Sequence, residues 1–329
     1  IVGGAGQGFE LLTGIPASVS AAVIAVVAMV ILATGSYRYI ERVMLALVIG
    51  FTFTTILSAV MMQFTDFRLT TDDLATGFSF DFPLEYAALA IAMYGYTGVN
   101  SGEIAAYTYW CVEKGYPKYI GADRSDPKWV ERAKGWIKVL QTDVWATLII
   151  LTFATVPFFI LGAGVLFEMG AKPEGIDTVK VLSGMFTETL GGWSLWVFAL
   201  GAFFILFSTT ISGVGAGGRV FPDYAIEFGF ANRQTIRRAT WTRIYVIAIP
   251  LFAYTLYMLS AQRPILLIQI SATFAAITLP IQSGATLFLQ KRHMDPRVRP
   301  GKTMHVALWA TFIFQLCMTI FVLGFLFFG

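Results

Sequence analysis

The stretch Gly95-Tyr96-Thr97-Gly98-Val99-Asn100-Ser101-Gly102-Glu103 lies inside an apolar run that extends from about residue 86 to residue 110. Each glycine costs a helix about 1 kcal/mol relative to alanine, so this stretch predicts an interrupted helix. Its polar atoms would be tolerated in a bilayer only where they face protein or a water-filled path. Such discontinuous helices commonly hold the substrate of a transporter. The alternative is a glycine-rich packing surface, with Glu103 reaching the membrane interface.

The composition places the chain among helical membrane proteins. Of its 329 residues, 57% are hydrophobic and 13% are charged, whereas about 25% are charged in a soluble domain. Mean hydropathy is +0.70, and apolar runs of about 20 residues recur, the length that a helix needs to cross a bilayer. We therefore expect an all-α polytopic membrane bundle that forms one transporter domain over residues 1–329. The two cysteines cannot define a disulfide framework or a zinc site.

Eight apolar runs predict eight membrane-spanning helices, the third of which contains the interruption. Residues 1–13 are small and apolar apart from Gln7 and Glu10, so we expect them to end an earlier helix and the chain to be truncated at its N-terminus. The polar connections, including 112–139 and 168–190, are too short to fold a sizeable core. The predicted spans are residues 17–34, 43–63, 84–111, 140–167, 191–217, 241–261, 264–290 and 304–328.

Lysine and arginine are distributed unevenly between the two sides of the predicted bundle. Assigning the loops alternately to two sides puts 19 of the 23 on one side, which the positive-inside rule makes cytoplasmic. We expect an integral protein of a bacterial inner (plasma) membrane. The basic loops would meet anionic lipid headgroups, so the bilayer is an expected partner and nucleic acid is not. The opposite side is acidic, which raises the local cation concentration modestly. The oligomeric state stays open.

The residues do not favour an enzyme. The only histidines, His293 and His305, flank one polar loop. No histidine pair or carboxylate pair at catalytic spacing lies within one apolar run. We therefore expect neither catalysis nor a cofactor, and an intramembrane enzyme is the less favoured alternative.

Four motifs resemble those of the Nramp divalent metal transporters and occur in that family's order. Leu12-Thr13-Gly14-Ile15-Pro16 resembles the turn between the third and fourth helices, and Tyr37-Arg38-Tyr39-Ile40-Glu41-Arg42-Val43 resembles the entry to the fifth. The run from Ser208 to Gly217 is similar to the eighth-helix Ser-Ser-Thr-x-Thr-Gly-x-x-Ala-Gly motif, and Leu279-Pro280 matches the tenth helix. The resemblance covers essentially the whole chain, from the end of the third helix to the eleventh.

The resemblance implies a LeuT-like five-plus-five inverted repeat that lacks its first two helices here. It also implies transport of a divalent metal cation as substrate, with proton symport as an alternative that the sequence leaves open. In the family, an Asp-Pro-Gly-Asn motif of the first helix supplies half of the metal site, and residues 1–329 do not contain it. We therefore expect residues 1–329 alone to be inactive in transport.

The remaining half of the family's site departs from its pattern. The sixth-helix motif Ala-Thr-x-Met-Pro-His aligns with Tyr96-Thr97-Gly98-Val99-Asn100-Ser101, and Thr278 replaces the tenth-helix glutamine. Val99 removes a soft thioether ligand, and the oxygen atoms that remain suit hard cations such as Mg²⁺ or Mn²⁺. Family branches without the methionine are linked to magnesium or trivalent aluminium. The predicted substrate-binding residues are Tyr96, Thr97, Val99, Asn100, Ser101, Glu103 and Thr278, with Glu103 and Asn100 as predicted metal ligands.

Two interpretations stay open among the other polar residues. Asp143 could relay protons or pair with Lys138, and Gln282 could face the transport pathway or pack between helices. A transporter of the amino acid and polyamine type shares the implied architecture and is the alternative function. Because Glu103 would repel the carboxylate of an amino acid, the sequence favours a cation.

Overall fold

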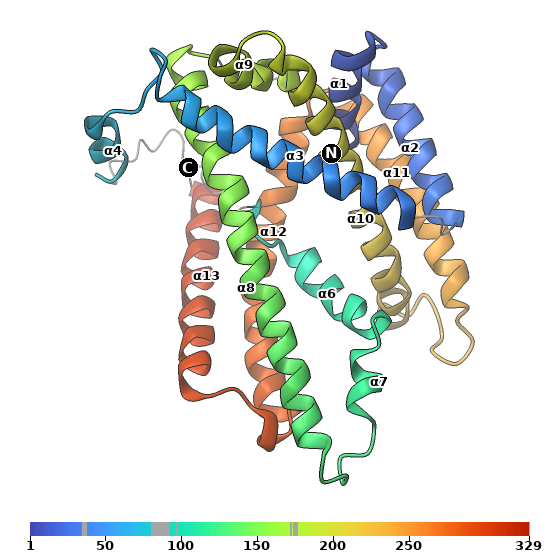
Figure 1. Ribbon diagram of the computed structural model, residues 1–329. Helices are drawn as coiled ribbons and strands as arrows, with labels where there is room; N and C mark the ends of the chain where they lie inside the picture. Colours follow the sequence, from blue (N-terminus) through green and yellow to red (C-terminus); the bar gives the residue numbers. More distant parts are fainter. Residues whose placement is uncertain (35–37, 80–92, 97, 172, 174–176, 329) are drawn as a thin grey trace. The chain divides into compact units, whose positions relative to one another are not determined.

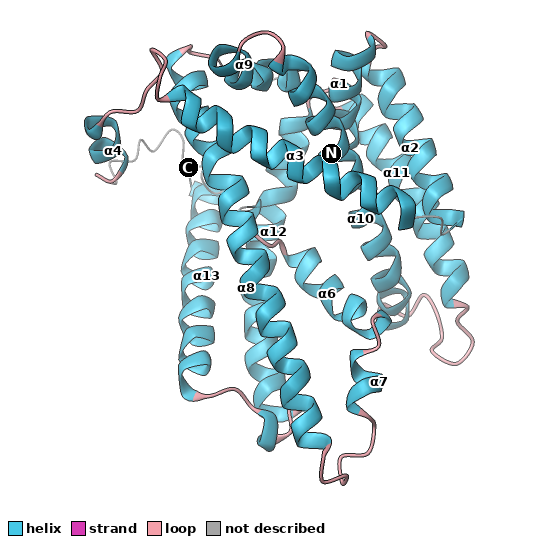
Figure 2. Ribbon diagram, viewed as in Figure 1, coloured by secondary structure: helices cyan, strands magenta, loops and turns pink. Residues whose placement is uncertain are grey.

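The computed structural model describes residues 1–34, 38–79, 93–96, 98–171, 173 and 177–328. Every regular element in these ranges is helical (Figure 2). The helices are α1 (Val2–Thr13), α2 (Ala17–Thr34), α3 (Arg38–Met62), α4 (Thr71–Gly77), α6 (Ser101–Glu113), α7 (Tyr116–Ile120), α8 (Trp129–Leu161), the π-helical turn η2 (Gly162–Leu166), α9 (Thr178–Leu190), α10 (Ser194–Glu227), α11 (Arg238–Leu259), α12 (Pro264–Arg292), the 3₁₀ turn η4 (Pro296–Val298) and α13 (Lys302–Phe328).

The chain forms two compact units, each built from two segments. Unit 1 comprises Ile1–Asp81 and Ile150–Ile268, and unit 2 comprises Phe82–Ile149 and Gln269–Gly329. In unit 1, the long helix α10 packs against α1, α2, α3, α9 and α11, while α2 also packs against α1 and α11 (Figure 1).

Small residues let the helices of unit 1 approach closely. Ala21, Ala25 and Ala28 of α2 are fully or almost fully buried, together with Ala5 of α1. In lipid the hydrophobic effect does not drive helices together, so membrane helices associate by close van der Waals packing. Small residues allow that close packing. The surrounding larger side chains include Ile211 of α10 and its buried neighbours. This packing explains why a run as apolar as α2 still has a defined buried face.

Aromatic rings form a second core in unit 1. The ring of Phe51 on α3 lies 5.7 Å from that of Phe186 on α9 and 6.1 Å from that of Phe198 on α10, centre to centre. Phe186 and Phe198 are themselves 4.9 Å apart. Such tilted ring pairs add about 0.5–1.5 kcal/mol beyond the area they bury. The core therefore fixes α9 against α3 and α10.

In unit 2, α12 and α13 are joined by a hydrogen bond that proline makes available. Pro280 lies inside α12, and its missing N–H leaves the carbonyl four residues earlier, on Ala276, without its usual helical donor. The hydroxyl of Thr319 on α13 donates to this carbonyl at 3.0 Å. Nearby, the rings of Tyr94 and Phe314 make an edge-on contact at 6.0 Å. A side chain thus replaces the missing backbone donor, as the bilayer interior requires.

The structure confirms most of the predicted spans. Among the described residues, six helices are long and apolar enough to cross a membrane, and they correspond to the predicted spans at 17–34, 140–167, 191–217, 241–261, 264–290 and 304–328. The predicted span 43–63 falls in α3, whose described apolar part is Val48–Met62. Part of the predicted span 84–111 lies outside the described residues. The protein is therefore an all-α integral membrane protein.

Three boundaries were predicted wrongly. Residues 168–190 were expected to form a connection, yet α9 occupies Thr178–Leu190. The long helix expected from residue 140 already begins at Trp129, and α10 continues to Glu227, beyond the predicted end at residue 217. In all three places polar residues lower the hydropathy without breaking the helix, so a hydropathy pattern reports the membrane-embedded part of a helix rather than its ends. The single-domain organisation and the inverted repeat stay predictions.

Candidate functional site

The predicted interruption is present in the helix before α6. Residues 93–96 are helical, residues 98–100 are not, and α6 begins at Ser101. Gly98 has φ = +92°, a conformation that residues with a Cβ atom rarely adopt. Thr97, one of the predicted site residues, lies outside the described residues. The structure therefore confirms the interruption and leaves the role of Thr97 a prediction.

Asn100 and Glu103 form a capping box at the start of α6. The Asn100 Oδ1 atom accepts a hydrogen bond from the Glu103 N–H, and Glu103 Oε2 accepts one from the Asn100 N–H, each at 3.1 Å. This reciprocal pair satisfies two backbone donors that helix geometry leaves free. The spacing Asn-x-x-Glu is itself the sequence signal for such a box, and the sequence interpretation missed it. Both predicted metal ligands thus also have a local structural role.

One face of α12 holds the interrupted segment within unit 2. The Tyr96 hydroxyl lies 3.0 Å from the Ser271 hydroxyl, and the Ser101 and Thr278 hydroxyls are 2.7 Å apart. The Gln282 amide Nε2 donates to the Ser101 carbonyl. Positions 271, 278 and 282 share a face because their separations are close to whole turns of an α-helix. The structure therefore brings the predicted residues Tyr96, Ser101 and Thr278 to the same face of α12.

Gly95 permits this close approach to α12. A Cβ atom on residue 95 would lie 1.8 Å from the carbonyl oxygen of Ala272 and 3.0 Å from the backbone nitrogen of Ala276. Only glycine fits against backbone atoms at that separation. Val99, by contrast, has a side chain that is 49% exposed. Gly95 therefore allows the interrupted segment to pack against α12, while the side chain of Val99 remains accessible at the interruption.

A second polar pair joins α6 to α8. The Tyr107 hydroxyl donates a hydrogen bond of 2.6 Å to the Asp143 carboxylate. Tyr107 is four residues after Glu103, so both lie on one face of α6. Among the described residues, Asp143 makes no ion pair with Lys138 or another base. The phenol is therefore the partner that sequence analysis did not find, because α6 and α8 meet only in the fold.

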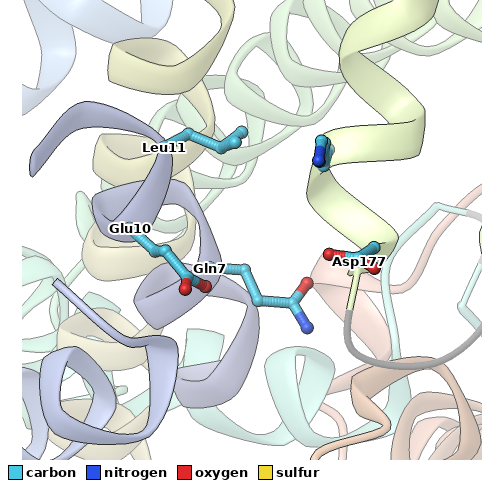
Figure 3. A pocket seen from close by; sticks show the side chains of 5 residues that line it. Gln7, Glu10, Leu11 and Asp177 are labelled. Atoms are coloured by element: carbon cyan, nitrogen blue, oxygen red, sulfur yellow. The ribbon is translucent and has the colours of Figure 1, made fainter. Parts of the chain in front are cut away.

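Unit 1 contains a small polar cavity between α1 and the start of α9 (Figure 3). Its volume is about 180 Å³. Gln7, which is only 3% exposed, accepts a hydrogen bond of 3.2 Å from the Val179 N–H through its Oε1 atom. This bond fixes α1 against the N-terminus of α9. The residues that line the cavity are Gln7, Glu10, Leu11, Asp177 and Lys180.

The described residues do not supply a carboxylate-rich metal site. Across the parts of the chain that the structure describes, no group of three or more His, Cys, Asp or Glu side chains could hold a metal ion. At the interruption, the oxygen atoms belong to one carboxylate, four hydroxyls, two side-chain amides and the backbone. Such a set suits a cation that keeps part of its water shell.

Two basic segments of unit 2 contact each other through a cluster formed by Arg124, Trp129, Asp295 and Arg297. The guanidinium groups of Arg124 and Arg297 lie 5.8 and 5.5 Å from the centre of the Trp129 ring. Arg297 also donates to the Arg124 carbonyl at 3.1 Å and to Asp295 at 2.8 Å. Stacking of this kind is favourable because the ring face is negative. The cluster therefore ties the segment before α8 to the segment between α12 and α13.

Acid is expected to loosen this cluster. Hydrogen bonds from Arg297 lower the pKa of Asp295 from 3.8 to about 2. Because the folded pKa is the lower one, the stabilisation is complete above the ordinary pKa and is lost as pH falls toward about 2. Backbone protection factors at residues 294–299, measured by hydrogen exchange, should stay constant from pH 7 to 5 and fall below pH 4. Asp295→Asn should lower them at neutral pH and remove this dependence; unchanged protection in that variant would contradict the expectation.

Comparison with known proteins agrees with the motifs and the fold. No curated protein is found to match the chain. The model of the natural resistance-associated macrophage protein-like (Nramp) family matches residues 1–324, almost the whole chain. Nramp proteins are transporters rather than a class of enzymes, and divalent metal ions are their substrates. The chain therefore belongs to the Nramp family of divalent metal cation transporters.

Proposed function

We propose that the protein carries a divalent metal cation through the interruption before α6 and prefers hard ions such as Mg²⁺ or Mn²⁺ to soft ions such as Cd²⁺. The observation that carries this proposal is that the side chains beside the interruption offer oxygen atoms, from the hydroxyls of Ser101 and Thr278 and from the capping box. Val99 stands where the family has a methionine thioether. Oxygen ligands suit hard ions, and sulfur favours soft ones.

The charge of Glu103 has a specific use in this proposal. The N-terminus of α6 faces the interruption and carries a positive partial charge, which by itself repels a cation. Glu103 lies in the first turn of α6 and is the only acidic residue there. Its carboxylate offsets the helix dipole, and its second oxygen is free of the capping box. We therefore assign Glu103 an electrostatic role, with Asn100 and the hydroxyls contributing neutral oxygens.

The proposed direction is inward across a bacterial inner membrane, with the side rich in lysine and arginine in the cytoplasm. Proton symport is part of the proposal, because an ionisable residue inside a membrane span generally has a functional role. Asp143, bonded to Tyr107 on the same face of α6 as Glu103, is the proposed proton carrier. Under this proposal, an inward proton gradient accelerates cation uptake.

Val99→Met is expected to shift selectivity toward soft ions. The full-length protein is reconstituted in liposomes, and Mn²⁺ uptake is measured with increasing Cd²⁺, with and without an inward proton gradient. A thioether at position 99 should make Cd²⁺ at least about threefold more effective as a competitor.

The matched control is Val112→Met, which places the same side chain on an exposed position at the far end of α6. Cd²⁺ should inhibit Mn²⁺ uptake by this variant as strongly as it inhibits uptake by the wild type. Equal Cd²⁺ sensitivity in Val99→Met and Val112→Met would contradict a role of position 99 in ion selectivity. Uptake of an amino acid in place of Mn²⁺ would favour the alternative function.

A further inference from the structure

Gln282 lies beside the interruption and has an unusual hydrogen-bonding state. It is two residues after Pro280 on α12, half-buried, and its Nε2 atom donates to the Ser101 carbonyl. Ser101 is the first residue of α6. The side chain therefore touches the backbone at the point where the helix resumes.

The Ser101 carbonyl determines which way the amide is turned. A carbonyl oxygen can only accept, so Gln282 must present its NH₂ group to it. The Oε1 atom is consequently directed away from Ser101. It is buried, and no hydrogen-bond donor reaches it from the part of the chain that the structure describes.

A buried acceptor without a partner is uncommon in native proteins and calls for an explanation. The hydrogen bond to Ser101 explains the Nε2 donor but not Oε1, which that bond leaves as a buried acceptor without a partner. The oxygen lies on the α12 face that already contributes Ser271 and Thr278 to the interruption. An uncharged amide oxygen is a common ligand of hard cations, directly or through one of their waters.

We propose that Gln282 is a substrate-binding residue whose Oε1 atom accepts the transported cation or a water bound to it. The inference rests on the proposed function and adds to it a ligand that the seven predicted site residues did not include. In this assignment Gln282 has two roles, since Nε2 holds the interruption and Oε1 faces the ion. A residue that only held the helices together would need the first role alone.

Three substitutions separate these roles in the full-length protein in liposomes. Gln282→Leu and Gln282→Met both remove the Nε2 donor, but only methionine places a ligand atom near the position of Oε1. Gln282→Glu also removes the donor and keeps two acceptor oxygens. Thr286→Val, one turn further along α12, is the positional control, because it removes a hydroxyl that donates to the Gln282 backbone carbonyl.

If Oε1 binds the ion, Gln282→Leu raises the KM for Mn²⁺ by about tenfold while Gln282→Glu raises it by no more than about threefold. Competition by Cd²⁺ is then at least about threefold stronger in Gln282→Met than in Gln282→Leu. Thr286→Val leaves both quantities unchanged. Size-exclusion profiles establish that each variant is folded, and the methionine and leucine pair still decides the matter if Gln282→Glu does not fold.

A purely structural Gln282 predicts a different result. All three variants then share one KM and one ratio of Cd²⁺ to Mn²⁺ competition, which would overturn the inference while wild-type uptake remains. If the wild type itself takes up no Mn²⁺ or Mg²⁺ above empty liposomes, the proposed function has failed instead.

Discussion

Gly95→Val is expected to abolish the folded protein. Even the first carbon of the new side chain would lie 1.8 Å from the Ala272 carbonyl oxygen. Because that neighbour is backbone in the middle of α12, it cannot move aside as a flexible side chain would. The interrupted segment would have to move away from α12 and lose the bonds to Ser271, Thr278 and Gln282. Overpacking typically costs about 1–3 kcal/mol, and we expect the upper end or more here because the lost hydrogen bonds add to it.

The measurement is the yield of monodisperse protein after extraction in mild detergent, followed by thermal denaturation. Gly135→Ala on α8 is the control, since a Cβ atom there would meet nothing within 4 Å. It should keep the wild-type yield and gain up to about 1 kcal/mol from helix propensity. A Gly95→Val protein with wild-type yield and melting temperature would show that the break and α12 are not packed as described.

Glu103→Gln is expected to reduce Mn²⁺ uptake at low concentration by about tenfold, equivalent to about 1.4 kcal/mol. The substitution is nearly isosteric, and glutamine can occupy the same position of a capping box. The hydrogen bond from the Asn100 N–H is therefore retained while the negative charge is lost. Without that charge, the positive end of α6 faces the cation unopposed.

Two further measurements separate charge from structure in this prediction. The melting temperature of Glu103→Gln should stay within about 2 °C of the wild type, because the cap is intact. Glu103→Ala loses both the cap and the charge, so it should be less stable and equally impaired in uptake. Normal Mn²⁺ uptake by a folded Glu103→Gln variant would remove the residue from the transport pathway.

The membrane-spanning helices were predictable from the sequence where a long apolar run is bounded by polar or turn-forming residues. Six of the eight predicted spans correspond to long apolar helices, because twenty apolar residues in sequence have few alternatives to a membrane helix. The interruption near Gly98 was predictable for a local reason, since clustered glycines weaken a helix whatever surrounds them. The helix α9 was not, because three of its six buried residues are polar, which lowers its hydropathy, and it is buried by packing on α3 and α10.

The partners within the candidate site were not predictable from the sequence. Ser101 meets Thr278 and Gln282 across 177 and 181 residues of chain, and Tyr107 meets Asp143 from another helix. A single sequence places such residues on helices but does not show which faces meet. The family resemblance named Thr278 through the tenth-helix motif. For Gln282 the sequence left two interpretations open, and the unpaired oxygen is what favours the transport pathway. Asn100 and Glu103 carried a local signal, the capping box, which competes with the metal-ligand interpretation.

The most direct test of the account is uptake of Mn²⁺ by the wild-type full-length protein in liposomes, with Mg²⁺ and Cd²⁺ as competitors and empty liposomes as background. The oxygen set at the interruption and the absence of a thioether at Val99 predict saturable Mn²⁺ uptake above background. They also predict that Mg²⁺ inhibits the uptake of labelled Mn²⁺. Cd²⁺, the soft ion, should inhibit this uptake less than unlabelled Mn²⁺ does. Uptake no greater than background, or Cd²⁺ competing better than unlabelled Mn²⁺, would contradict the account.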